Sequence, residues 1–217
     1  MSEKLQNIVF NRETFRTVFN ASDSMLDDLH LYAQLLLKWQ KYMNLIGKSS
    51  VHDIWGRHFA DSIQLFNLLN LKAKTLIDLG SGAGFPGLIL ALKFLDSGGP
   101  QVHLIESNQR KAGFLMEANR ILKTRVIVHA KRIENINDLK GDIIIARGLA
   151  PLDRLLNFAK MLIKHDSECF FLKGQNVSQE LTEAKKKWKM NVIEINSLTR
   201  KGAKILKITK ISSIAKI

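Results

Sequence analysis

The segment from residue 75 to residue 87, TLIDLGSGAGFPG, constrains the fold more than any other part of the chain. A short apolar run leads into three glycines at alternate positions, Gly80, Gly82 and Gly84, and a helix is predicted over residues 85–95. Glycine permits positive φ and lets a ligand approach bare backbone, so this spacing predicts a tight turn that faces a bound molecule. A strand, a glycine-rich turn and a helix in this order are typical of nucleotide-binding α/β sheets.

A second predicted strand, residues 101–106, ends in the carboxylate Glu106, 26 residues after Gly80. A ribose-binding acid lies at about this distance from the glycines of a nucleotide site. The dinucleotide pattern G-x-G-x-x-G requires a glycine where this chain has Phe85. The form found here, D-x-G-x-G-x-G beginning at Asp78, instead resembles the S-adenosylmethionine (SAM) site of Rossmann-like methyltransferases. A purely structural glycine turn in another α/β protein is the alternative.

Strands and helices alternate from residue 73 onward, which predicts a mostly parallel sheet covered by helices on both faces. No helix separates the last two strands, so we expect an antiparallel hairpin at the edge. The predicted fold class is therefore α/β, a Rossmann-like SAM-dependent methyltransferase fold with a seven-stranded sheet. The predicted strands are residues 75–79, 101–106, 125–129, 142–146, 167–173, 190–196 and 203–210, and the predicted helices are residues 85–95, 108–123, 151–165 and 177–188.

Residues 1–70 are predicted to form an N-terminal helical extension, packed in a single globular unit with the SAM-binding methyltransferase domain of residues 71–217. Apolar side chains at helical spacing predict one helix over residues 22–46, and a second over residues 54–63. The second helix has Arg57, His58 and Asp61 close together on one face, followed by Ser62. We expect this polar cluster to support the cofactor loop.

The net charge points to a polyanionic partner. The chain has 33 basic and 20 acidic residues, a formal charge of +13 and a pI near 9.9. Nucleic acid is the first candidate for such a surface, and a generally basic composition is the alternative. From Gly174 onward, the sequence contains ten lysines and arginines and only three acidic residues.

Several functional classes are not favoured. The lone Cys169 cannot form an internal disulfide, which fits a reducing, cytoplasmic location. The N-terminus lacks the pattern of a signal peptide, and no apolar run approaches the ~20 residues of a membrane span, so no membrane partner is predicted. The six histidines show no metal-ligand spacing, so no metal is predicted. Composition favours a monomer.

Ligands of such sheets bind outside the carboxyl ends of the strands, which selects the residues that follow each strand. Glu106 is placed to accept the ribose hydroxyls, and Ile133 to form an apolar wall against adenine. Arg147 and Lys173, at the ends of two later strands, place positive charge at the mouth of the site. For Arg147, an equally favoured alternative is a strand-end cation that pairs with a neighbouring acid.

Several stretches form a specific set, namely residues 37–45, 57–62, 78–87 with the phrase G-x-G-F-P-G, 111–115, 132–134, 146–147 with Ala150, and 172–175. Together they resemble the ribosomal RNA small-subunit methyltransferase G family, the 16S rRNA guanine-N7 methyltransferases. The resemblance implies SAM contacts at Gly80, Phe85, Ile133, Glu134 and Arg147. The sequence departs from the family at Ile89, where proline is frequent, and at Ala146 and Gly148 around Arg147.

Methylation at guanine N7 needs no general base, because this nitrogen has an exposed lone pair and no proton. The chain has no Pro-Pro pair, so it lacks the [DNS]-P-P-[YF] signature of amino-group methylation, and Cys169 inside a strand is badly placed for the thiol chemistry of pyrimidine C5 methylation. Together with these absences, the resemblance implies a SAM-dependent enzyme that methylates guanine N7 in 16S rRNA, within the 30S subunit or a precursor. We expect Arg147 and Lys173 to orient the RNA or the methionine carboxylate. A nicotinamide-dependent oxidoreductase, a non-enzymatic RNA-binding factor, and a methyltransferase for small molecules or proteins are the alternatives.

Overall fold

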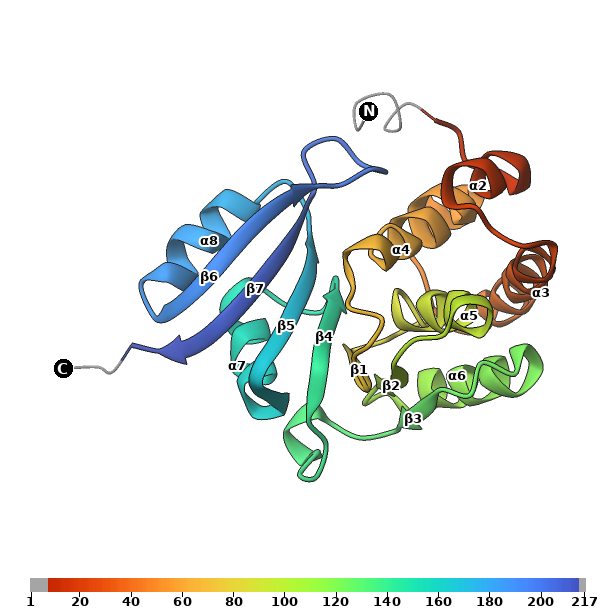
Figure 1. Ribbon diagram of the computed structural model, residues 1–217. Coiled ribbons are helices and arrows are strands. Elements are labelled where there is room, and N and C mark those ends of the chain that lie inside the picture. The colour runs from red at the N-terminus through yellow and green to blue at the C-terminus, as the bar shows by residue number, and fades with distance from the viewer. Residues whose placement is uncertain (1–7, 215–217) are drawn as a thin grey trace.

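A computed structural model describes residues 8–214, which form a seven-stranded sheet flanked by helices (Figure 1). The strands are β1 (Thr75–Leu79), β2 (Gln101–Ile105), β3 (Ile127–His129), β4 (Gly141–Arg147), β5 (Ile163–Lys173), β6 (Trp188–Asn196) and β7 (Lys204–Ser213). The α-helices are α2 (Arg12–Phe19), α3 (Asp23–Gln40), α4 (Asp61–Ile63), α5 (Gly87–Ser97), α6 (Gln109–Leu122), α7 (Leu152–Leu162) and α8 (Val177–Lys185). The shorter turns are η1 (Lys48–Asp53), the π-helical η2 (Trp55–Ala60), η3 (Phe66–Leu68) and η4 (Ile133–Asn135).

The sheet has the strand order β3-β2-β1-β4-β5-β7-β6. The strands β1 to β5 pair in parallel, and β7 pairs antiparallel with β5 and with the edge strand β6. This confirms the predicted fold class and the antiparallel hairpin. Because the strand order reverses at β1, the loop after β1 lies at the switch point, where sheets of this kind bind their ligands.

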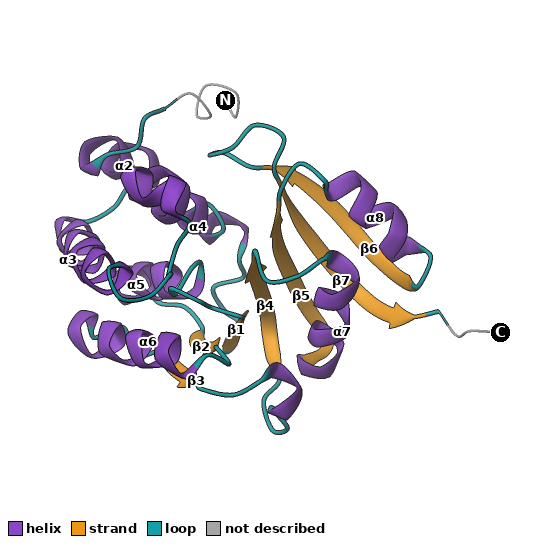
Figure 2. Cartoon of the chain, turned by 180° about the vertical axis from the view of Figure 1, so that it is seen from behind, coloured by secondary structure: helices purple, strands orange, loops and turns teal. Residues whose placement is uncertain are grey.

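Alternate residues along β1 face two hydrophobic cores on opposite faces of the sheet. Leu76 faces the core made with the N-terminal helices, α5 and α6, whereas Ile77 and Leu79 face the core made with α7 and α8. Figure 2 shows these two groups of helices on either side of the strands. Continuous apolar strands such as Ile143–Ala146, buried on both faces, are what a central parallel strand requires.

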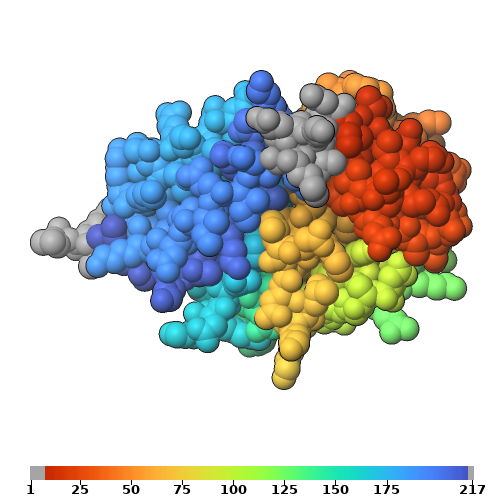
Figure 3. All heavy atoms as spheres, turned by 45° about the horizontal axis from the view of Figure 1, so that its top comes forward, coloured from red at the N-terminus to blue at the C-terminus, as the bar shows by residue number. Residues whose placement is uncertain are grey.

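The N-terminal helices pack on α5 and α6. Phe15, Tyr32 and Phe59 are fully buried and share one core with Phe114 of α6. Figure 3 shows the N-terminal helices and the C-terminal hairpin on opposite flanks of this face. The first seven residues of the predicted extension lie outside the described residues, and the domain boundary near residue 70 stays a prediction.

Several predicted helices differ from the structure in their ends or in their type, among them the helix predicted over residues 177–188, which ends at Lys185 because β6 begins at Trp188. The helix predicted over residues 22–46 ends at Gln40, because the Gln40 side chain accepts the amides of Leu45 and Ile46 and folds the chain back. The helix predicted over residues 54–63 is the π-helix η2 followed by the short α4. The helix predicted to reach residue 165 ends at Leu162, since β5 already begins at Ile163, which pairs with Gly141. Within residues 8–214, no helix is long and apolar enough to span a membrane.

Candidate active site

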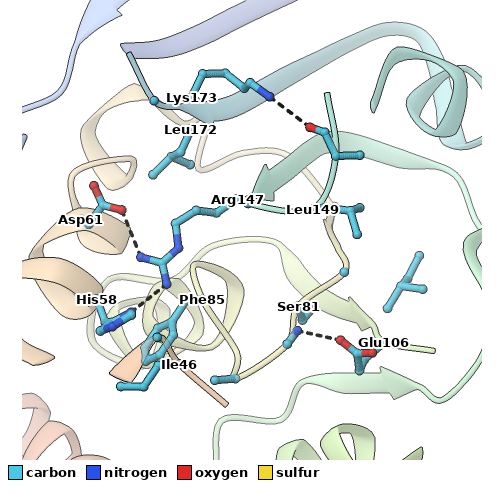
Figure 4. Close-up of a pocket in the computed structure, with 18 of the residues that line it drawn as sticks. Ile46, His58, Asp61, Ser81, Phe85, Glu106, Arg147, Leu149, Leu172 and Lys173 are labelled. Carbon is cyan, nitrogen blue, oxygen red and sulfur yellow. Dashed lines mark hydrogen bonds and ion pairs between the residues drawn. The ribbon is translucent and has the colours of Figure 1, made fainter. Parts of the chain in front are cut away.

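A cavity of about 700 Å³ opens at the carboxyl edge of the parallel strands. Its walls come from the glycine loop after β1, the end of β2, η4, the ends of β4 and β5, and the loop between β6 and β7. Figure 4 shows the side chains of several of these elements converging on the same space. The predicted site residues that line it are Gly80, Gly82, Phe85, Glu106, Ile133, Glu134, Arg147 and Lys173.

The glycine loop has the left-handed backbone that its sequence predicts. Gly80, Gly82 and Gly84 have φ of 64°, 58° and 85°. A Cβ on Gly80 would come within 2.5 Å of Leu149 Cδ1, and a Cβ on Gly84 would come within 2.8 Å of the Tyr32 hydroxyl. At Gly82 the nearest atom would be 3.8 Å away, so this position faces open space. Gly80 and Gly82 therefore form the floor of the cavity, whereas Gly84 makes room for the core behind it.

Tyr32 connects α3 to this loop. Its ring is fully buried between Phe85 and Phe114, and its hydroxyl donates to the carbonyl of Ala83. Burial raises the pKa of this phenol, so the hydroxyl keeps its proton and remains a donor.

Glu106 directs its carboxylate to the loop from the end of β2. Its Oε2 accepts the Gly82 amide at 2.9 Å, and its Oε1 accepts the Asn108 amide at 2.7 Å. The residue is buried except for 8% of its surface and lines the cavity. Each carboxylate oxygen retains acceptor capacity beyond its backbone partner. The group is therefore oriented and able to accept hydrogen bonds from the two hydroxyls of a bound ribose.

Asp78 lies behind the loop and does not line the cavity, although we predicted it among the cofactor-binding residues. It is fully buried, its Oδ2 accepts the Gly87 amide at 3.0 Å, and its Oδ1 has no partner among the described residues. Burial raises its pKa to about 7, against the opposing effect of the Gly87 amide. Asp78 faces the core because it alternates with Ile77 and Leu79 on β1, and it anchors the start of α5.

Ile133 and Glu134 are on η4, at the side of the cavity. Ile133 is 7% exposed and belongs to the core under α7, whereas Glu134 is exposed. This arrangement leaves an apolar side chain and polar groups of the same turn beside the glycine loop, as an adenine ring would require.

Arg147, the last residue of β4, is held by the N-terminal segment. Its Nη1 donates to Asp61 Oδ2 and to the carbonyl of Arg57, each at 3.0 Å, and its Nη2 lies 3.0 Å from His58 Nδ1. The guanidinium carbon lies 5.0 Å from the centre of the Phe85 ring (Figure 4). A guanidinium bonded through its fork and stacked on a ring has a fixed plane. Arg147 therefore both pairs with an acid and lines the cavity, so the two interpretations of this residue are compatible.

His58 is held as a neutral ring. Its Nε2 lies 2.8 Å from Ser50 Oγ, which itself donates to the carbonyl of Gly47, so we assign the ring proton to Nε2. The unprotonated Nδ1 then accepts from Arg147. Burial, and next the charges of Arg147 and Arg57, lower its pKa to about 3. His58 also stacks on Phe85 at 4.9 Å, so the polar cluster contacts the cofactor loop as well as Arg147.

Lys173, the last residue of β5, is directed away from Arg147. Its Nζ donates to the carbonyl of Ala150 at 3.0 Å and pairs with Glu180 Oε2 at 2.6 Å. Glu180 Oε2 also accepts the amide of Leu152 at 2.7 Å. The side chain of Lys173 is 9% exposed. Its amino group thus fixes the loop between β4 and α7, the loop that carries Leu149 against Gly80.

The sequence predicted for Asp61 only a shared role in the cluster that supports the cofactor loop, and it gave no prediction for Gln64 and Thr199. Asp61 Oδ1 accepts from Thr199 Oγ1 at 2.8 Å and from Gln64 Nε2 at 2.9 Å, while its Oδ2 accepts from Arg147. The spacing of Arg57, His58 and Asp61 was a usable signal for a shared partner. Nothing in the sequence marks Thr199, because it lies 138 positions from Asp61.

Basic side chains dominate the cavity wall and its mouth. The basic lining residues are Arg57, Lys111, Lys131, Arg132, Arg147, Arg154, Lys173, Arg200 and Lys204, and the acidic ones are Asp61, Glu106 and Glu134. Two of those acids already accept from Arg147 and from the glycine loop, so the mouth has a positive potential. Cys169 lies fully buried in β5, where burial raises its pKa. Among the residues from 8 to 214, no three histidines, cysteines or acids lie together in a way that would hold a metal ion.

Solved methyltransferases share the fold at low sequence identity. A ribosomal protein L11 methylase from Lactobacillus delbrueckii subsp. bulgaricus is similar with a TM-score of 0.54 at 15% identity, over 69% of this chain and 76% of that chain. The glycopeptide N-methyltransferase MtfA, solved in complex with SAM, is similar with a TM-score of 0.55 at 9% identity, over 71% of this chain and 95% of that chain. These likenesses concern the fold alone.

The sequence itself is similar to one family along most of its length. The profile described as rRNA small subunit methyltransferase G (GidB) matches residues 25–209. The ribosomal RNA small subunit methyltransferase G of Paramagnetospirillum magneticum is 46% identical over 200 residues, which cover 92% of this chain and 96% of that protein. With a profile match of this extent and a relative of this identity, the chain belongs to the rRNA small subunit methyltransferase G family.

Proposed function

We propose that this protein is a SAM-dependent methyltransferase that methylates N7 of one guanine in 16S rRNA. The observation that carries the proposal is the bond between the Glu106 carboxylate and the Gly82 amide, at one end of a cavity whose mouth is basic. A ribose-accepting acid beside a bare-backbone loop fits a nucleoside cofactor, and a positive mouth fits a polyanionic substrate. Membership of the family supports the same reaction and substrate.

The residues around the glycine loop fit SAM. Gly82 leaves room for the cofactor against bare backbone, and Gly80 makes room for Leu149 beside it. Glu106 accepts hydrogen bonds from the ribose hydroxyls, and Ile133 and Glu134 border the adenine. Asp78 and Gly84 support the loop from the core side. Asp78 holds the start of α5, and Gly84 leaves space for the Tyr32 side chain. When bound, SAM supplies an electrophilic methyl group on a positively charged sulfur.

No residue of the chain needs to remove a proton from the substrate, because guanine N7 has none. The work of the protein is therefore alignment and electrostatics. Arg147, with its plane fixed by Asp61, His58 and Phe85, orients either the methionine carboxylate or the guanine at the cavity wall. Lys173 acts indirectly, because its amino group fixes the loop that packs Leu149 against Gly80.

The rRNA is bound within the 30S subunit or a precursor of it, and the enzyme acts as a monomer in the cytoplasm, where its substrate is. Transfer of radiolabelled methyl groups from SAM to 30S subunits from cells that lack the endogenous activity tests the reaction. Strand scission at N7-methylguanine then locates the label. We expect label on one guanine of 16S rRNA, and label elsewhere would contradict the substrate. Light scattering of the eluting protein tests the monomer.

Replacing Gly82 with valine tests the position of the cofactor. The new side chain enters open cavity space, since no atom lies closer than 3.8 Å to the added Cβ, but the φ of 58° disfavours it. We expect SAM affinity to fall by about tenfold or more while the far-UV spectrum stays unchanged. Gly113→Ala on α6, where nothing lies within 4 Å of the added Cβ, is the matched control. Unchanged SAM affinity in the valine variant would contradict this position.

A further inference from the structure

The loop between β6 and β7, residues 197–203, lies on the N-terminal segment at the mouth of the cavity. In Figure 1 it extends from the ends of β6 and β7 toward α4. Gln64, which is 5% exposed, uses both ends of its amide for this contact. Its Oε1 accepts the Leu198 amide at 2.8 Å, and its Nε2 donates to the carbonyl and the Oδ1 of Asp61, each at 2.9 Å. The loop is thus anchored through its backbone by a buried side chain.

The same loop is joined to Arg147 through one carboxylate. Thr199 Oγ1 donates to Asp61 Oδ1 at 2.8 Å, and Arg147 Nη1 donates to Asp61 Oδ2 at 3.0 Å. A buried or half-buried group with two directional partners restricts both of them. The position of the loop is therefore fixed relative to Arg147, which lines the cavity.

The loop carries two adjacent cations and no acid. Its sequence is SLTRKGA, and both Arg200 and Lys201 are exposed. Within the described residues 8–214, neither of them has an ion-pair partner, whereas Lys204 at the start of β7 donates to Asn196 Oδ1 at 2.7 Å. Arg200 lines the cavity, and so does the exposed Arg57. Unpaired exposed cations at a fixed place fit successive phosphates of a nucleic-acid backbone.

We propose that Arg200 and Lys201 bind the RNA backbone next to the target nucleotide, and that Gln64 is the positioning residue that holds their loop. This inference rests on the proposed function, since it takes RNA as the substrate. It assigns RNA binding to one loop instead of to the positive charge of the whole surface. A cation pair in a loop tied to Asp61 presents the strand at a set distance from Arg147, which scattered surface lysines do not do.

The double variant Arg200→Ala/Lys201→Ala tests the contact. The matched control is Lys185→Ala/Lys189→Ala, which removes the same charge from exposed positions on α8 and β6 that do not line the cavity. Filter binding to 16S rRNA, over a series of salt concentrations, gives affinity and salt dependence. We expect the loop variant to bind about tenfold or more weakly and its log–log salt slope to fall by about 1.5, as for two lost phosphate contacts. The control changes affinity by less than about threefold.

The variant Gln64→Leu tests the positioning role. It removes the amide that holds Leu198 without touching a cation of the loop. We expect the KM for rRNA to rise by about fivefold, while kcat at saturating rRNA and the Kd for SAM stay within twofold. A merely destabilised protein would instead lose active enzyme, so kcat would fall at unchanged KM. Thermal unfolding of each variant checks the fold.

The outcomes separate the two proposals. If the wild-type protein methylates rRNA and the loop variant binds rRNA as tightly and with the same salt slope as the control, the inference about the loop is wrong. If the wild-type protein binds SAM and transfers no methyl group to rRNA in any assembly state, the proposed function itself is wrong. If Gln64→Leu lowers kcat with KM unchanged, the assigned positioning role is wrong.

Discussion

Arg147 and Lys173 end neighbouring parallel strands, yet the structure uses them differently. Arg147 pairs in register with Leu172, so the two cations leave the sheet one residue apart. Arg147 turns toward the N-terminal segment, where Asp61, the Arg57 carbonyl and His58 hold it over Phe85. Lys173 turns toward Ala150 and Glu180, on the side of α7 and α8.

The difference shows that a strand-end position brings a cation to the ligand edge of the sheet but does not determine its task. The task follows from the acceptors within reach. Arg147 meets acceptors around its fork and lines the cavity, whereas Lys173 meets two acceptors that take up two of its three N–H donors. The comparison predicts different kinetic behaviour for the two residues.

Arg147→Ala should have the largest effect. The variant removes the fixed charge at the cavity wall and leaves Asp61 without its cation, so we expect kcat/KM to fall by about 100-fold or more. Arg147→Lys should rescue little, because an amino group cannot reproduce the planar fork. Steady-state methyl transfer to 30S subunits measures both. Activity within threefold of wild type in either variant would remove the distinction between the two cations.

Lys173→Ala should cost less, about tenfold in kcat/KM, because the residue acts through the loop between β4 and α7. Glu180→Gln, which weakens the same ion pair without altering the cation, should have an effect in the same direction and of similar size. Measured together, the two variants show whether Lys173 acts through the loop or on the substrate itself. If Lys173→Ala is inactive while Glu180→Gln is normal, the lysine contacts the substrate directly, and the contrast with Arg147 disappears.

The smallest expected effect is that of His58, and it concerns the pH dependence of the stability of the folded protein. Its pKa is lowered to about 3 in the folded protein, so the folded state binds fewer protons than the unfolded state below the unfolded value near 6.5. The stability that neutral His58 contributes is present above pH 6.5 and is lost as the pH falls toward 3. The difference in unfolding free energy between wild type and His58→Gln should therefore shrink by about 2 kcal/mol between pH 7 and pH 5. Urea unfolding at the two pH values measures it, and a constant difference would mean that His58 is protonated beside Arg147.

The parts that the sequence predicted well are set by local spacing. Strand β1 occupies the predicted residues 75–79, since an apolar run between polar residues and glycine leaves little freedom. The glycine loop and Glu106 could be predicted because they belong to one βαβ unit, in which short connections fix the turn and the ends of the strands. The hairpin followed from the missing helix between β6 and β7.

The parts that were not predicted depend on partners distant in sequence. Arg147 and Asp61 lie 86 positions apart, and Gln64 and Leu198 lie 134 apart, so no periodicity connects them. Asp78 belongs to the glycine motif, but the alternation of β1 turns its side chain into the core under α5. Spacing along the sequence likewise does not distinguish Trp39, which packs inward and donates to Glu117, from Tyr42 just beyond α3, which is 73% exposed.

The hydroxyl of Tyr32 reaches the carbonyl of Ala83 across 51 positions, which makes the cofactor loop depend on α3. Docking of α3 and binding of SAM are then linked equilibria. A ligand that requires the loop stabilises the docked helix by the factor 1 + [L]/Kd. Amide hydrogens in α3, which do not touch the cofactor cavity, should accordingly exchange more slowly with solvent as SAM saturates the protein.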